Sequence, residues 1–540
     1  MGLTYRLAQL TITEREFLQG QSNARSLRMV ALPVSRGMVY DRNGLPLAAS
    51  TMLKSLWIDP SEVDLQPLLD SGLADLVQMD KKSLADKVKQ NAKKEFVYIK
   101  RHMDPAIEMP IRELGLSGVG LQKEFKRYYP DSESAAQLVG RTNIDEKGVE
   151  GLELAYDAWL KGEPGKERVT KDRLGRIIAK GQTVVPAKEG NDLYLSIDKK
   201  DQAVVYEVLA EGVKRSGAKS GSAVVLDAKT GEVLAVTNYP SYNPNDTHHI
   251  DPEQVRNRAI TDLFEPGSTV KPISMLAALN QGKRQVDDTI DIGKGHMMLE
   301  GHDISDVHHS DSNEISLTDI LVYSSNVGIA KLVLELPVSA YLTELANYGF
   351  GQSTGSGFPG EPTGAMVNNI RQGSFDQASL SYGYGASMTL LQLSQAYLHL
   401  ASCGAVKHVQ LLRDDSPHRD TPSSVTHCKA VHQMMSRVVS PGGTGARAAV
   451  KGYQVAGKTG TSYIASNKGY DTNRYIASFA GFAPAESPQY VVAIALWEPD
   501  YAHHFGGRSA APIFAQIMQH LLVFKGAPLE RDTSSSRRYN

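Results

Sequence analysis

The clearest hydrophobic pattern in this 540-residue chain is a pair of short apolar runs joined by a turn. Ser222–Asp227 and Glu232–Thr237 are rich in Val, Leu and Ala, and Ala228–Gly231 lies between them. Because glycine readily adopts the positive φ that such connections need, the pattern predicts a β-hairpin. Further apolar runs predict strands nearer the C-terminus, at residues 453–461, 475–482 and 490–497.

Between these strands the apolar positions follow a helical spacing. Helices are predicted over much of residues 268–340 and 390–437. One of them, Leu317–Tyr323, is preceded by Ser316, with Asp319 three positions later, a pattern similar to a capping box. Strands at both ends with helices between them predict an α+β domain in which helices flank one antiparallel sheet.

The N-terminal part of the chain has a different character. Residues 20–188 combine short predicted strands and helices with many charged positions, and they contain no cluster of nucleophile and base. The turn-rich segment Pro186–Asp192, followed by the alternating strand Leu193–Ile197, indicates a boundary. We therefore predict an extended mixed α/β pedestal over 20–188, a second domain over 189–525 and a disordered tail over 526–540.

Composition narrows the function classes only slightly. The chain has 41% hydrophobic and 22% charged residues and a formal net charge of −2, which are ordinary values for globular proteins. The balanced charge argues against a nucleic-acid partner. Cys403 and Cys428 are the only cysteines. Their spacing does not match a metal motif, and both the free and the disulfide-bonded states stay open.

The sequence contains no membrane-spanning pattern. Its longest uninterrupted apolar run, Tyr490–Trp497, has eight residues, against roughly 20 for a helix that crosses a bilayer. Met1–Gln19 mixes charged and polar positions and does not match a signal peptide. Taken by themselves, these features predict a soluble protein.

A serine and a lysine three residues apart carry the first candidate chemistry. Ser268 and Lys271 stand in Glu265–Pro272, directly after a Pro-Gly pair that can end a loop and start a helix. On a helix, positions i and i+3 lie on one face. A serine hydroxyl needs an adjacent base to act as a nucleophile, and a desolvated lysine with a lowered pKa can serve. Alone, this short pattern is common and therefore weak.

Two further elements strengthen the prediction. Ser324-Ser325-Asn326 follows the predicted helix Leu317–Tyr323, and Lys458-Thr459-Gly460-Thr461 lies in the predicted strand 453–461. Each alone suits an ordinary loop or turn. All three together, in this order and at domain-scale spacing, match the motif set of the penicillin-binding proteins and serine β-lactamases. We therefore predict an acyl-serine enzyme.

Longer segments extend the resemblance. From residue 30 to about 525 the chain resembles the class B penicillin-binding proteins, and among them the division-specific transpeptidases of Gram-negative bacteria or their paralogues. The segments that carry this resemblance are Arg36–Gly44, Arg127–Pro130, Gly148–Glu153, Phe264–Pro272 and Ser324–Gly328. It implies a penicillin-binding transpeptidase domain over 189–525 on a pedestal of the dimerisation type over 20–188.

The resemblance implies a peptidoglycan D,D-transpeptidase that uses no cofactor. Ser268 is expected to attack the D-Ala-D-Ala bond of a stem pentapeptide, with Lys271 as general base. Ser324 is expected to pass the proton to the leaving amine, and Asn326 to order Lys271 and the substrate amide. An amine on the acceptor strand then closes a 4→3 cross-link during septal wall synthesis, and β-lactam antibiotics are expected to acylate Ser268 in place of the peptide.

The third motif is expected to hold the substrate's terminal carboxylate. The residues assigned to it are Lys458, Thr459, Gly460 and Thr461. The backbone N–H groups of Ser268 and Thr461 are the expected oxyanion hole. The family also places aromatic side chains near the cleft, and the matching positions here are Tyr384, Tyr475, His504 and Phe505. Simple core packing is an alternative role for Tyr384 and Tyr475.

The resemblance also changes the expected location. Its members carry one N-terminal anchor in the inner membrane and work in the periplasm, so residues 1–19 are expected to be a juxtamembrane remnant whose anchor is absent from this sequence. The expected protein partners are a membrane glycan polymerase and other divisome proteins.

Other functions compete with this interpretation. His302, His308 and His309 with Asp303 and Asp306 suggest a metal site, but their loop-like setting and the metal-free mechanism argue against one, and we predict none. A β-lactamase would leave the pedestal unexplained. A D,D-carboxypeptidase differs only in the acceptor, which sequence does not decide, and a β-lactam sensor or divisome scaffold would not need every catalytic residue.

Overall fold

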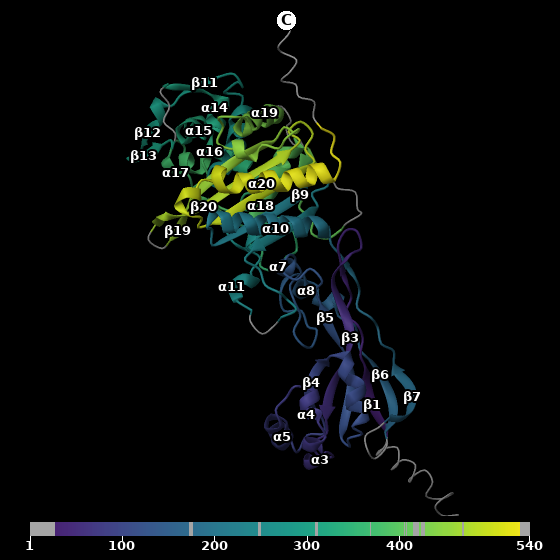
Figure 1. Cartoon of the computed structure of the whole chain (residues 1–540). Helices are drawn as coiled ribbons and strands as arrows, with labels where there is room; N and C mark the ends of the chain where they lie inside the picture. The colour runs from purple at the N-terminus through teal and green to yellow at the C-terminus, as the bar shows by residue number, and fades with distance from the viewer. Residues whose placement is uncertain are drawn as a thin grey trace, which may run out of the picture.

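The chain forms two territories that follow one another along its long axis (Figure 1). The structure, a computed structural model, describes residues 27–171, 177–246, 250–307, 312–367, 369–403, 405–406, 408–413, 421–422, 427–466 and 469–529. Over these ranges, none of the helices combines the length and the apolar character that crossing a bilayer requires. Residues 1–19, and 530–540 of the predicted tail, lie outside the described residues.

A five-stranded antiparallel sheet organises the second territory, with strand order β10-β9-β21-β20-β19. Its strands are β9 (Ser220–Asp227), β10 (Val233–Tyr239), β19 (Ala456–Ser466), β20 (Gly469–Ala483) and β21 (Tyr490–Trp497). The predicted hairpin is confirmed, since β9 and β10 are antiparallel neighbours. Gly231 in its turn has φ +81°, and a Cβ there would lie 2.5 Å from the His408 carbonyl oxygen, so glycine suits this position.

The sheet separates two hydrophobic cores. Val224 faces one core, and its neighbour Val225 faces the other. Because successive side chains of a strand point to opposite faces, a strand covered on both faces is apolar along its whole length. Helices α10 (Lys199–Ser216) and α20 (Gly506–Phe524) pack on one face, and α18 (Leu390–Ser402) packs on the other (Figure 1). This is the α+β architecture that the sequence predicts.

The remaining helices of this territory include those that carry the candidate motifs. They are α11 (Pro252–Val255), α12 (Arg258–Thr261), α13 (Lys271–Asn280), α14 (Leu317–Val322), α15 (Asn326–Leu334), α16 (Val338–Asn347), α17 (Phe375–Ser381) and α19 (Cys428–Val439). The predicted cap at Ser316 is confirmed, because its hydroxyl accepts a hydrogen bond from the Asp319 N–H at 3.1 Å.

The prediction of helices over much of 268–340 misses a block of short strands. Two small hairpin-like pairs, β11 with β14 and β12 with β13, interrupt the helices. Their bounds are β11 (Thr289–Asp291), β12 (His296–Leu299), β13 (His302–Ser305) and β14 (Glu314–Ser316). Each of these strands has only three or four residues, too few for a clear alternating pattern, which explains why sequence reasoning did not find them. Other short pairs are β15 (Ala365–Met366) with β16 (Ala386–Ser387) and β17 (Ala405–Val406) with β18 (Thr421–Pro422).

The pedestal is built on β3 (Pro46–Ile58), a long strand with partners on both sides. Its sheet contains β2 (Val39–Tyr40), β4 (Val97–Met103) and β5 (Val119–Tyr128), and a second sheet contains β1 (Leu27–Leu32), β6 (Gly165–Lys171) and β7 (Ile177–Val185). The pedestal helices are α3 (Leu65–Asp70), α4 (Leu73–Leu76), α5 (Lys81–Gln90), α6 (Glu108–Glu113), α7 (Ala136–Val139), α8 (Gly151–Ala155) and α9 (Asp157–Leu160).

A buried ion cluster holds the upper part of the pedestal together. The Glu153 carboxylate, whose side chain is fully buried, accepts from Arg36 Nε at 2.6 Å and from Arg127 Nε at 2.7 Å. Arg36 also pairs with Asp157 at 2.7 Å. Arg36, Arg127 and Glu153 come from three of the segments on which the family resemblance rests. Each buried charge therefore has an opposite charge beside it, as burial requires.

The two territories meet through backbone and amide contacts. Asn245 donates to the Tyr129 carbonyl and accepts from the Tyr129 N–H, both at 2.9 Å. β8 (Leu193–Tyr194), which comes just after the predicted domain boundary, pairs with β2 of the pedestal sheet. The predicted strand Leu193–Ile197 is therefore too long. After a single bridge at Leu195, the backbone turns so that Asp198 can cap the first turn of α10.

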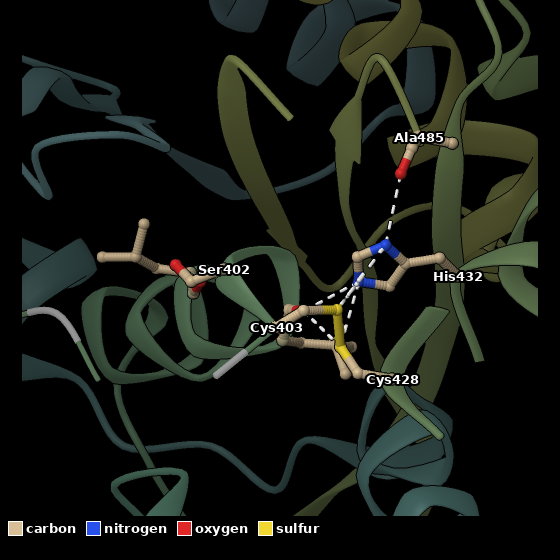
Figure 2. Close-up of a disulfide and its surroundings, with 7 residues drawn as sticks. Ser402, Cys403, Cys428, His432 and Ala485 are labelled. Carbon is tan, nitrogen blue, oxygen red and sulfur yellow. Dashed lines mark hydrogen bonds between the residues drawn. A yellow bond between two sulfur atoms is a disulfide. The ribbon is translucent and has the colours of Figure 1, made fainter. Parts of the chain in front are cut away.

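A disulfide joins Cys403 at the end of α18 to Cys428 at the start of α19, with their Cα atoms 5.6 Å apart. This settles the question that the sequence left open. Figure 2 shows the His432 ring beside both sulfur atoms, with Nε2 at 3.3 Å from Cys403 Sγ and 3.4 Å from Cys428 Sγ. Since the sulfurs are bonded to each other, they are not thiolate ligands for a metal here.

Candidate active site

Ser268 lies in a tight turn at the head of α13. Gly267–Val270 forms a 3₁₀ helix, and the α-helix itself begins at Lys271, followed by Pro272. The predicted α-helical start is therefore a tighter 3₁₀ turn. In a 3₁₀ helix positions i and i+3 eclipse one another, so Ser268 and Lys271 still lie on the same face of the helix. Ser268 is only partly buried, and its hydroxyl takes part in none of the hydrogen bonds among the described residues. A group in this position is available to a ligand.

Lys271 is fully buried and binds the second motif. Its Nζ donates to the Ser324 carbonyl at 2.7 Å, to Ser324 Oγ at 3.2 Å and to Asn326 Oδ1 at 2.7 Å. Burial lowers the pKa of Lys271 to about 7, and the charge of Asp306 opposes that shift. A lysine with a pKa near neutrality is present in both forms at neutral pH, so it can accept a proton and return it.

The second motif is a turn between α14 and α15. Ser324 has φ +62°, a left-handed conformation that is uncommon outside glycine, and Ser325 is the N-cap of α15, accepting from the Gly328 N–H. Asn326 is the first residue of α15, and its Nδ2 donates to the Ser305 carbonyl at 3.0 Å. The turn thus presents a carbonyl, a hydroxyl and an amide oxygen to Lys271.

The third motif lies on β19, the edge strand of the main sheet. Lys458 is fully buried, and its pKa lies well below the usual value because of burial and, second, the charge of Lys271. Its Nζ donates to Thr459 Oγ1 at 3.2 Å. Thr461 Oγ1 accepts from the Gly506 N–H at 3.3 Å. Because an edge strand has no strand partner on one side, its outward backbone groups can bind other groups, as the Tyr463 backbone binds the Tyr384 side chain.

The 3₁₀ turn and β19 approach each other closely at Gly460. A Cβ at Gly460 would lie 2.8 Å from Thr269 Cγ2 and 3.1 Å from the Pro266 carbonyl oxygen. Gly267 and Thr461 are similarly close, since a Cβ on Gly267 would lie 3.1 Å from the Thr461 carbonyl oxygen. Glycine in the third motif therefore lets the strand lie against the turn that carries Ser268. The structure brings all three predicted motifs together.

The four predicted cleft residues fall into two aromatic groups. Tyr475 packs against His504 with ring centroids 4.7 Å apart, and the His504 and Phe505 rings lie 4.0 Å apart. Tyr384 belongs to another group and makes an edge contact with Tyr470 at 5.3 Å. The ring contacts of Tyr384 and Tyr475 agree with the packing alternative, and a role in ligand binding stays a prediction.

Sequence reasoning missed two residues near these motifs. Glu265, three positions before Ser268, accepts from the Tyr470 hydroxyl at 3.0 Å and from the Gly385 N–H at 2.9 Å. Burial raises the pKa of the Glu265 carboxyl. Tyr470 stands near the tip of the β19–β20 hairpin, and no short motif contains it. Its contact with Glu265 depends on how far the hairpin extends, which local patterns do not reveal.

Asp306 has a structural role that the metal hypothesis did not anticipate. It accepts hydrogen bonds from the Asn326 and Val327 N–H groups and from Ser325 Oγ. His302 stacks on Phe375 with ring centroids 4.2 Å apart, while His308 and His309 lie outside the described residues. Asp303 pairs with His296 at 3.5 Å. The members of that set which the structure describes therefore have separate partners.

Comparison with known proteins finds two matching domains that together cover most of the chain. Residues 221–519 match the model of the penicillin binding protein transpeptidase domain, and residues 31–195 match that of the penicillin-binding protein dimerisation domain. The peptidoglycan D,D-transpeptidase FtsI of Escherichia coli is 39% identical over 528 residues, which cover 96% of this chain and 88% of that protein. The probable peptidoglycan D,D-transpeptidase PbpC of Pseudomonas aeruginosa is 37% identical over 519 residues, with 96% and 92% covered.

Solved structures agree. The crystal structure of penicillin binding protein 3 from Mycobacterium tuberculosis complexed with aztreonam has a TM-score of 0.71 and 27% identity, covering 93% of this chain and 98% of that one. The apo transpeptidase domain of penicillin-binding protein 3 from Burkholderia pseudomallei has a TM-score of 0.56 and 36% identity, covering 62% and 97%.

Proposed function

The chain belongs to the class B penicillin-binding proteins and is a peptidoglycan D,D-transpeptidase, and from this premise we propose how its residues perform the transfer. The observation that carries the proposal is the buried Lys271 ammonium group, which contacts Ser324 and Asn326 while it stands one turn from Ser268. A nucleophile, a base of near-neutral pKa and a second hydroxyl then occupy one site.

The first half-reaction acylates Ser268. Neutral Lys271 takes the hydroxyl proton as Oγ attacks the carbonyl carbon of the penultimate D-Ala. The negative charge that develops on the carbonyl oxygen is stabilised by the backbone N–H groups of Ser268 and Thr461, since donors aimed at that position lower the barrier. The C–N bond then breaks, and the proton reaches the leaving D-Ala amine through Ser324, which Lys271 contacts at 3.2 Å.

The second half-reaction transfers the acyl group. The amine of a neighbouring stem peptide attacks the ester carbonyl, loses its proton to Lys271 and forms the new amide, while Ser268 recovers its proton. Asn326 holds Lys271 in place during both steps and is available to the substrate amide. The result is a 4→3 cross-link, and no cofactor takes part in either step.

The third motif supplies the carboxylate site. Lys458, Thr459 and Thr461 lie within four residues of one edge strand, which Gly460 allows to lie against the Ser268 turn. Burial disfavours the charged form of Lys458, and an anion bound there would favour that form and so offset the effect of burial. β-Lactams carry a carboxylate and a strained amide in a similar arrangement, so they acylate Ser268 and inhibit the enzyme. Tyr384, Tyr475, His504 and Phe505 are proposed to border this cleft.

The cellular setting is proposed from the family. We propose that residues 20–188 form the pedestal and that residues 189–525 form the transpeptidase domain. We also propose that a single N-terminal anchor holds the protein in the inner membrane and that the catalytic domain works in the periplasm during septal synthesis. A membrane glycan polymerase and other divisome proteins are the proposed partners.

Product analysis tests the proposed function. The protein is incubated with a pentapeptide donor and an acceptor amine, and the products are separated by mass. A cross-linked dimer supports transpeptidation. Free tetrapeptide alone would indicate a carboxypeptidase, and no turnover despite β-lactam binding would indicate a sensor or scaffold. The same assay with Ser268→Ala must show no product.

A further inference from the structure

Asp306 is a buried carboxylate directly behind the second motif, and the mechanism above gives it no role. It is 6% exposed and follows β13. Its oxygens accept from Asn326 N–H at 2.6 Å, from Val327 N–H at 2.9 Å and from Ser325 Oγ at 2.6 Å. These groups belong to the N-cap and first turn of α15, so a carboxylate from another element satisfies helix donors that have no partner within the helix.

Asp306 and Lys271 bind the same turn, Ser324–Asn326, through different atoms. Ser324 is held at φ +62°, where a residue other than glycine is strained by about 1 kcal/mol or more. Such a conformation persists only when surrounding contacts determine it. The backbone N–H of Asn326 donates to Asp306, and the side-chain Nδ2 of Asn326 donates to the carbonyl of Ser305, the residue before Asp306. The end of β13 therefore sets where Asn326 Oδ1 meets Lys271.

The charge of Asp306 also acts on Lys271. Asp306, beside α15, is the charged group that acts on Lys271, and the nearby Lys458 on β19 is a second buried amine whose own pKa is lowered by burial and then by the charge of Lys271. Asp306 favours the ammonium form of Lys271, whereas burial favours the neutral amine. A single carboxylate thus offsets part of the desolvation of the proposed base.

We propose that Asp306 is a positioning residue for acyl transfer, whose carboxylate holds the Ser324–Asn326 turn against Lys271 and whose negative charge stabilises the protonated form of that lysine. This proposal rests on the proposed function, because it assigns Lys271 the role of base. It distinguishes Asp306 from an ordinary helix cap, since a cap affects stability and geometry but would not change the pH at which the base becomes active.

The decisive variant is Asp306→Asn. An asparagine oxygen can still accept the two backbone N–H groups, and its amide can donate to Ser325 Oγ, so the turn is kept while the charge is removed. The rate of acylation by a fluorescent penicillin is measured from about pH 5.5 to about pH 8.5. We expect the acidic limb of the profile to move to lower pH in the variant, because Lys271 loses the charge that favours its protonated form.

Two variants separate charge from geometry. Ser325→Ala removes one hydrogen bond to Asp306 and the cap of α15 but keeps the charge, so we expect a lower plateau rate with the limb unmoved. Asp303→Asn removes a carboxylate from the same hairpin, where the side chain is 55% exposed and pairs with His296, so we expect the parent's profile. Thermal unfolding of each variant confirms that the proteins compared are folded.

The outcomes are distinct. If the parent is acylated at Ser268 and Asp306→Asn has the parent's limb, the charge role is wrong while the proposed function stands. If the parent itself is not acylated, both fall. If Asp306→Asn does not fold, Asp306→Glu keeps the charge and displaces the carboxylate from the turn. A lower plateau rate with the parent's limb would then support the proposal, and a plateau equal to the parent's would overturn it.

Discussion

Lys271 Nζ and Asn326 Oδ1 lie 2.7 Å apart although 55 positions separate the two residues in the chain. The contact joins the first α-helical residue after the Ser268 turn to the first residue of α15, and it lies where no solvent reaches the lysine. A buried amine whose partners are neutral oxygens loses the solvation that stabilises its charge. This is the physical reason why a lysine can act as the proposed base here at neutral pH.

Covalent labelling tests the nucleophile. Ser268→Ala removes the hydroxyl that forms the ester, so a fluorescent penicillin is expected to label the parent once per chain and not to label the variant. Intact mass and gel fluorescence measure this. Because Ser268 is only partly buried, the variant should unfold at nearly the parent's temperature. Labelling that persists in a folded variant would assign the nucleophile to another residue.

Substitutions of the two buried lysines, Lys271 and Lys458, are expected to impair different steps of acylation. Lys271→Ala leaves Ser268 without a base, so the acylation rate should fall by about 10²- to 10⁴-fold with all substrates. Lys458→Ala removes a charged contact to the carboxylate, so the loss should be about 10- to 100-fold and appear mainly as weaker binding. Stopped-flow rates over a range of penicillin concentrations separate the two. A methyl ester of the penicillin is the control, since it should abolish the difference between the parent and Lys458→Ala.

The pH dependence follows from Lys271. The pKa of this lysine is lowered to about 7, and only the neutral amine can accept the Ser268 proton. The acylation rate of the parent should therefore rise as pH increases through about 7 and level off above it. The measurement is the initial labelling rate at constant ionic strength. A rate that does not change between about pH 6 and about pH 8 would contradict the assignment of Lys271 as base.

Much of this site could be predicted because its signals are local. Ser268 with Lys271, the turn at Ser324 and the glycine at Gly460 each sit within a few residues, and their helix or strand setting follows from flanking apolar patterns. The hairpin of β9 and β10 could be predicted for the same reason, since its two strands and its turn follow one another directly in the sequence. Three such segments, in a known order, are enough to predict that they share one site.

What could not be predicted depends on contacts between distant segments. Asp306 is an ordinary polar residue in sequence, and its role appears only when β13 ends beside α15. Glu153 is similar, because its two arginine partners lie 117 and 26 positions away. The 3₁₀ turn that carries Ser268 packs against β19, a strand that comes much later in the chain. Tertiary contacts of this kind leave no periodic pattern.

The buried cluster in the pedestal gives a stability prediction. Glu153→Ala leaves Arg36 and Arg127 without their buried counter-charge, so unfolding should become easier by about 3–5 kcal/mol. Urea unfolding measures this. The matched control is Lys188→Ala, which breaks an ion pair whose side chains are 72% and 76% exposed and should cost less than about 1 kcal/mol. Equal effects of the two variants would show that the cluster adds nothing beyond a surface pair.

The last prediction concerns the charge of Lys458. Its pKa is held well below the usual value by burial and by Lys271, so in the free enzyme a smaller fraction of this amine carries a proton than in an exposed lysine. A bound carboxylate favours the ammonium form, because an opposite charge stabilises it. Binding of a carboxylate-bearing ligand should therefore take up protons from the solution at neutral pH.

Calorimetry in buffers of different ionisation enthalpy measures that uptake. Ser268→Ala is used so that binding stays non-covalent, and the ligand is a penicillin. We expect net proton uptake, and we expect Ser268→Ala/Lys458→Met to lose both the uptake and most of the affinity. The penicillin methyl ester, which has no carboxylate, should bind without uptake. If the double variant takes up as many protons as Ser268→Ala, the proton goes elsewhere and Lys458 does not change its charge when the ligand binds.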